Sequence, residues 1–202
     1  MKRSCIWLFL AVFMPCAAQD GYIFGADHCF YFTTPNGWVA NNQLGANDGL
    51  PFVFYPLGGS WAHSPTVIYA RIADRDGAVR TIEDKVKDTL RDFRSNGSPH
   101  IKAQRIGPIT SKSGAKGELY KYSGDQWGND ELVAYFLGPH TINLFVMTSR
   151  NAKDFEAQRP ALVALAGSYR PAKDCKPCHA KDAQPAALPN ASQRTAARCS
   201  HS

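Results

Sequence analysis

The chain has 202 residues, of which 44% are hydrophobic and 20% charged, and its formal net charge is +6 at pH 7. The excess positive charge lies at the two ends, since residues 20–170 hold 16 basic and 15 acidic side chains. A nearly neutral body lacks the broad positive surface that binds phosphate backbones, so nucleic acid is not expected as a partner. The length suits one folded domain.

Residues 1–19 have the pattern of a cleaved secretory signal peptide. Lys2 and Arg3 form a basic start, an apolar run follows, and Cys16-Ala17-Ala18 is a small-residue exit. The run of about ten apolar residues is shorter than the ~20 that cross a bilayer. We therefore expect a periplasmic or secreted protein with no transmembrane segment after cleavage. A lipid anchor on Cys16 is a minor alternative.

The first half of the mature chain predicts antiparallel strands. Residues 28–34 alternate along a strand that Pro35-Asn36-Gly37 ends, and 52–55 form a buried strand. Residues 57–65 form a Gly-rich loop that leads into a strand over 66–72.

At Thr81 the apolar period changes to that of a helix. Thr81 and Asp84 have the spacing of a capping box, and we expect the helix to end near Asn96-Gly97. Its inward face holds four apolar residues: Ile82, Val86, Leu90 and Phe93.

The second half predicts four strands with short turns, and so hairpins. The strands are expected over 101–109, 117–122, 131–137 and 141–148. A closing helix should run from Asn151 to about Gly167 with Phe155, Leu162 and Leu165 inward and a kink at Pro160. Residues 171–202 are rich in Pro, Ala, Lys and Ser and predict a flexible tail.

The order of these elements, with Pro35-Asn36-Gly37-Trp38 and the closing Ser168-Tyr169-Arg170, resembles the PsbP-like superfamily, in particular its bacterial DcrB-like exported members. The resemblance covers about residues 22–170. It implies an α+β fold in which an antiparallel sheet is flanked by helices, an α/β sandwich. It also implies non-catalytic work, the binding or assembly of other proteins, without a cofactor.

Four cysteines remain after removal of the signal. An even count in an oxidising compartment favours disulfides, and three full pairings are open. The candidates are Cys29, Cys175, Cys178 and Cys199.

The tail also holds Cys175-Lys176-Pro177-Cys178-His179, the C-x-x-C-H pattern of covalent c-type haem. The alternative function is therefore a periplasmic electron carrier with haem at Cys175, Cys178 and His179. Only a short, polar segment follows His179, which argues against a haem domain. A zinc site from these cysteines, Cys199 and His179 or His201 is a weaker alternative.

Catalytic patterns are few. Ser60 and His63 share a loop, but Gly58-Gly59-Ser60-Trp61-Ala62 lacks the last glycine of a nucleophile elbow, and a strand follows instead of a helix. We therefore expect no enzyme and regard a hydrolase as a weak option.

Trp61 and Trp127 each lie in a Gly-rich loop. A tryptophan on a loop held by a rigid sheet is suited to contact a partner, although both rings could instead cap the core. The sequence thus predicts an exported, non-catalytic module that contacts an envelope or secreted protein, with these two residues as contact candidates.

Overall fold

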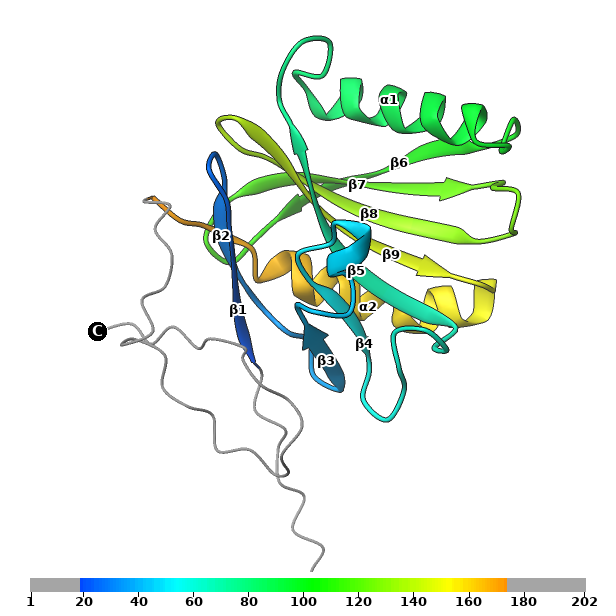
Figure 1. The fold of residues 1–202 in the computed structure, drawn as a ribbon, viewed down its shortest axis with the longest axis horizontal. Coiled ribbons are helices and arrows are strands. Elements are labelled where there is room, and N and C mark those ends of the chain that lie inside the picture. The colour runs from blue at the N-terminus through cyan, green and yellow to red at the C-terminus, as the bar shows by residue number, and fades with distance from the viewer. Residues whose placement is uncertain (1–18, 174–202) are drawn as a thin grey trace, which may run out of the picture.

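The computed structural model describes residues 19–173, which form an α+β fold of antiparallel sheets and helices, as the sequence predicts (Figure 1). One sheet has seven strands in the order β3-β4-β5-β9-β8-β7-β6, and a smaller sheet has the order β1-β2-β10. The elements are β1 (Asp20–Phe24), β2 (Cys29–Thr33), β3 (Trp38–Asn41), β4 (Val53–Pro56), β5 (Thr66–Asp74), α1 (Ile82–Ser95), β6 (Lys102–Thr110), β7 (Lys116–Ser123), β8 (Asp130–Leu137), β9 (Thr141–Ser149), α2 (Ala152–Gly167) and β10 (Arg170–Pro171).

The large sheet has a core on each face. Successive strand residues point to opposite faces, so on β8 Leu132 and Phe136 join the core beneath α2 and the small sheet, whereas Val133 and Tyr135 join the core beneath α1. This explains why β8 and β9 are almost continuously apolar instead of alternating. Strands buried on both faces need apolar residues at every position.

Helix α1 begins with the predicted capping box. The Thr81 hydroxyl accepts a hydrogen bond from the Asp84 amide (3.1 Å), and the Asp84 carboxylate accepts one from the Thr81 amide (3.0 Å). Ile82 and Val86 are buried against the sheet, and Asn96 caps the end of the helix. The amphipathic pattern read from the sequence therefore describes the helix correctly.

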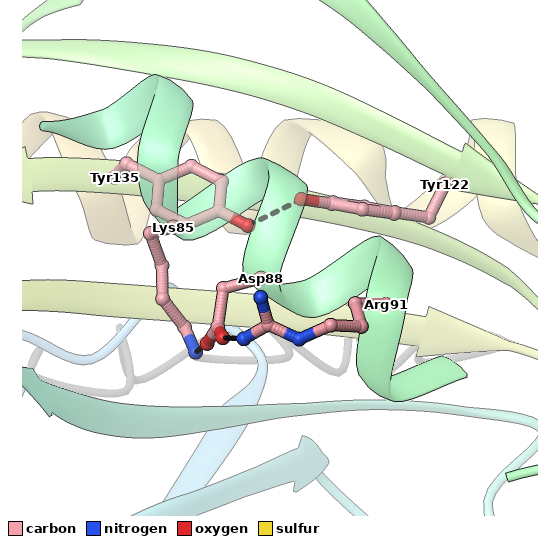
Figure 2. Close-up of polar contacts among 5 residues, drawn as sticks. All are labelled: Lys85, Asp88, Arg91, Tyr122 and Tyr135. Carbon is pink, nitrogen blue, oxygen red and sulfur yellow. Dashed lines mark hydrogen bonds and ion pairs between the residues drawn. The ribbon is translucent and has the colours of Figure 1, made fainter. Parts of the chain in front are cut away.

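Beneath α1, two buried tyrosines from neighbouring strands meet. The hydroxyls of Tyr122 and Tyr135 lie 2.7 Å apart, as Figure 2 shows. Along α1, Asp88 pairs with Lys85 and Arg91, which lie one turn to either side. These three charges of α1 thus pair with one another.

Helix α2 packs on the other face and begins at the Asn151 cap, whose side-chain oxygen accepts from the Asp154 amide. Phe155, Leu162 and Leu165 are buried, as predicted. Pro160 lies inside the helix and does not end it.

The chain then returns to its beginning, because β10 pairs with β2. The Ala172 amide donates to the Cys29 carbonyl (3.1 Å), so the end of the described chain lies beside β2, on the side opposite β1. The predicted signal peptide, except Gln19, and the tail beyond residue 173 lie outside the described residues.

Candidate functional site

Three loops gather at one end of the large sheet. Ser149, the last residue of β9, is opposite both Thr66 at the start of β5 and Asp130 at the start of β8, and Lys102 is opposite Ser123. The register therefore places loops 57–65, 96–101 and 124–129 at the same end, to the right in Figure 1. We call these three loops the tryptophan end, because the first carries Trp61 and the last carries Trp127.

Trp127 is presented by a loop with a dense set of hydrogen bonds. The Asp125 carboxylate accepts bonds from the Trp127 amide (3.1 Å), the Asn129 amide (2.7 Å) and the Asn129 side-chain amide (3.0 Å). Gln126 ties the same loop to the end of α1, where its amide donates to the buried Ser98 hydroxyl and its side chain donates to the Asn96 carbonyl. The ring of Trp127 nevertheless remains 66% exposed.

Trp61 behaves differently, since its ring packs edge-on against Tyr69 of β5 with ring centroids 6.3 Å apart. In the same loop Leu57 is 62% exposed. The Ser60 hydroxyl accepts from the backbone amide of His63 (3.3 Å), and so takes part in a turn. This loop structure gives the Ser60 and His63 pair a local structural role.

Tyr69 connects the two tryptophan loops through a partly buried acid. The Tyr69 hydroxyl and the Glu131 carboxyl group on β8 interact, and each shifts the pKa of the other. Burial, reinforced by the nearby charge of Asp125, raises the pKa of Glu131 to about 7, although Arg71 and the Tyr69 hydrogen bond act in the opposite direction. A protonated carboxyl group at this point costs less to bury than a charged one.

A groove lies beside the Trp127 loop, between the end of α1 and the β6–β7 hairpin. It has a volume of about 610 Å³, and the buried Ile101 is among its lining residues. We call it the basic groove; its lining residues are Arg94, Pro99, His100, Ile101, Lys102, Ser123 and Gly124. Arg94, His100 and Lys102 are all exposed.

The shape of the basic groove depends on a glycine. Gly124 has a φ of 89°, in the left-handed region, and a Cβ added there would lie 2.8 Å from the His100 carbonyl oxygen. Only glycine adopts this conformation without strain and allows the two backbone segments to approach so closely.

Of the four cysteine candidates, Cys29 alone lies within the described residues. Cys29 is buried on β2, and its Sγ lies 3.8 Å from the Ala172 carbonyl oxygen. Cys175, Cys178 and Cys199 lie outside the described residues, as do His179 and His201. The haem and zinc hypotheses therefore concern a part of the chain that is not described.

Within residues 19–173, His, Cys, Asp and Glu side chains do not gather in groups of three that could hold a metal ion. Neither described helix is long and apolar enough to cross a membrane.

Sequence reasoning missed Glu131 and the basic groove. Glu131 precedes a run of apolar residues and is easily read as the solvated start of a strand. The signal that identifies it is its position two residues before Val133, on the face that packs beneath α1. The groove residues come from α1, the loop that follows it, the start of β6, the end of β7 and the next loop, so only the folded chain brings them together.

No family model matches the chain, and a search of curated proteins finds no match. Among solved structures, the chain is similar to the cyanobacterial PsbP protein CyanoP of Synechocystis sp. PCC 6803, with a TM-score of 0.47 and 16% identity over 84% of this chain and 98% of that one. It is also similar to the Ran-binding protein Mog1p of Saccharomyces cerevisiae, with a TM-score of 0.44 and 13% identity over 74% of this chain and 88% of that one. No functional conclusion follows from these similarities.

Proposed function

We propose that this chain is an exported, non-catalytic binding or assembly module that contacts another envelope or secreted protein through the tryptophan end. The observation that carries the proposal is the state of Trp127, whose large apolar ring is 66% exposed on a loop held by four hydrogen bonds to Asp125 and Ser98.

Such a ring is suited to be a binding anchor for two reasons. Burying a large apolar side chain against a partner contributes about 1.5–3 kcal/mol, and tryptophan is enriched among the residues that dominate binding energy. A loop already fixed in one conformation also loses little entropy when the partner binds.

Trp61 and Glu131 support this surface from beneath. Trp61 packs on Tyr69, and Tyr69 interacts with Glu131, so the two loops are connected through the sheet. In this proposal Trp127 and Leu57 supply exposed apolar contacts, whereas Trp61 holds its loop in place.

The proposal is tested by capturing partners of the full-length protein in its native host, with a crosslinker applied before lysis. The same partner should be recovered with the wild type and with Leu137→Ala, and lost with Trp127→Ala. Leu137 is a matched control because it is 43% exposed and lies at the opposite end of β8. Equal recovery with all three proteins would remove Trp127 from the contact surface.

A further inference from the structure

We propose that the basic groove receives an acidic segment of the partner protein, with carboxylates placed against Arg94, His100 and Lys102 and a neighbouring aliphatic side chain packed on Trp127. This inference rests on the proposed function and specifies the chemistry of the partner.

The first argument is the unmatched charge of the groove. Several cations around α1 and the sheet have carboxylate partners: Lys85 and Arg91 pair with Asp88, Arg105 with Glu118, and Lys121 with Asp130. In the part of the chain that the structure describes, Arg94 and Lys102 make no such pair. Two permanent positive charges and a histidine thus line the same groove, and none of its lining residues is acidic.

The carboxylates of Asp125 and Asp88 make contacts of their own outside the groove. Asp125 directly follows Gly124 in the sequence, but its two carboxylate oxygens accept bonds from the Trp127 and Asn129 amides and from the Asn129 side chain. On α1, Asp88 is shared by Lys85 and Arg91. Because no acidic residue lines the groove, the carboxylates that contact Arg94 and Lys102 in this proposal come from another molecule.

The second argument is the combination of apolar and charged surfaces. Ile101 and Pro99 provide apolar lining, and the three basic side chains accompany them. Gly124, which lines the groove, is three residues before Trp127, so their Cα atoms are at most ~11 Å apart. One short segment is long enough to contact both the groove and the ring.

Exposed charges of this kind mainly affect the association rate and the specificity of binding. Complementary charge raises the association rate and disfavours basic partners, and it is screened by salt over roughly 8 Å at physiological ionic strength. Binding should therefore weaken as salt is added, while the apolar contact with Trp127 provides affinity that salt does not remove.

The experiment titrates the full-length mature protein with three blocked peptides that share a central leucine and differ only in their flanks, which are glutamate, glutamine or lysine. Tryptophan fluorescence and backbone amide shifts report binding. We expect the glutamate peptide to bind at least ~10-fold more tightly than the glutamine peptide at low salt, to lose that advantage at high salt, and to shift amides of residues 94–102 and 123–129.

Two charge-reversal variants distinguish binding in the basic groove from non-specific attraction to the net charge of the protein. Arg94→Glu with Lys102→Glu should abolish the preference for the glutamate peptide. Lys112→Glu with Lys116→Glu changes the net charge equally at the opposite end of the β6–β7 hairpin and should preserve it. An equal loss in both variants would overturn the inference, and thermal unfolding of each variant confirms that it is folded.

Vesicles of phosphatidylglycerol and phosphatidylethanolamine provide the remaining comparison. Binding to these vesicles through Arg94 and Lys102, without binding to the glutamate peptide, would overturn the inference in favour of an anionic membrane surface.

If the glutamate peptide does not bind but Trp127→Ala still loses the captured partner, the inference fails and the proposed function stands. If the peptide binds and Trp127→Ala still captures the partner, the proposed function fails.

Discussion

The hydroxyl of Tyr69 and the carboxyl group of Glu131 shift the pKa of one another, and this interaction connects β5 to β8 across β9 beneath the two tryptophan loops. It is an unusual place for an acid, because Glu131 is partly buried on the face of the sheet that otherwise carries the apolar core beneath α1. The burial of Glu131 raises its pKa, and the stability of the folded protein therefore depends on pH.

Glu131 should make the protein less stable as the pH rises from about 4.5 to about 7. Its pKa is raised from 4.5 to about 7 in the folded state, so the folded protein holds this proton more tightly than the unfolded chain. The stabilisation is complete below the unfolded pKa and is lost as the pH rises through the folded pKa, by up to ~3 kcal/mol.

Urea unfolding from pH 4 to pH 8 of the wild type and Glu131→Gln tests this. The difference between the two free energies of unfolding isolates Glu131 from the other titrating groups. A difference that does not change with pH would show that the carboxyl group is not perturbed.

The buried pair Tyr122 and Tyr135 should show strong coupling. Removing either hydroxyl leaves the other without this partner in a buried environment, at a cost of about 1–3 kcal/mol. The double variant Tyr122→Phe with Tyr135→Phe should lose less stability than the sum of the two single variants, because no orphaned hydroxyl remains. A double-mutant cycle by urea unfolding measures this, and additivity within ~0.5 kcal/mol would contradict it.

Gly124→Ala should destabilise the protein more than Gly128→Ala does. Both positions have positive φ, of 89° and 76°, and an L-residue there costs roughly 1–2 kcal/mol. Only at position 124 would the new Cβ also lie 2.8 Å from the His100 carbonyl oxygen, whereas position 128 is open. Thermal unfolding of the two variants compares the costs, and equal shifts would indicate that the backbone contact relaxes freely.

The cysteines should form disulfides once the protein is exported. Cys29 lies beside Ala172, only three residues before Cys175 in the sequence, which favours a disulfide between β2 and the tail. The intact mass of the exported protein from a host able to attach haem should correspond to cleavage near Gln19 and should gain only the hydrogens of reduced disulfides on reduction. A mass heavier by one haem that survives denaturation would favour the electron carrier instead.

Much of the fold could be predicted because its signals are local. The capping box at Thr81 and Asp84, the apolar period through Val86, and the Gly-containing turns depend on residues close in sequence, and the structure confirms them. Strands β1, β3 and β10 were not predicted, since they are short and their pairing partners decide them. In β10, Arg170 and Pro171 form a strand only because β2 is there to pair with.

Only part of the candidate site could be predicted from the sequence. A Gly-rich loop that carries Trp127 is a local signal, but whether the ring is exposed depends on the hydrogen bonds of Asp125 and Ser98. The same kind of local signal surrounds Trp61, whose ring packs on Tyr69. Glu131 and the basic groove depend on register and on contacts between distant segments, which no local pattern encodes.

The most direct test of the central claim measures the Kd of the captured partner for the wild type, Trp127→Ala and Leu137→Ala. If Trp127 anchors the contact, Trp127→Ala should lose at least 2 kcal/mol of binding free energy, about 30-fold in Kd, while Leu137→Ala binds like the wild type. A Kd for Trp127→Ala within about twofold of the wild-type value, in a variant that is equally stable to heat, would contradict a docking surface at the tryptophan end.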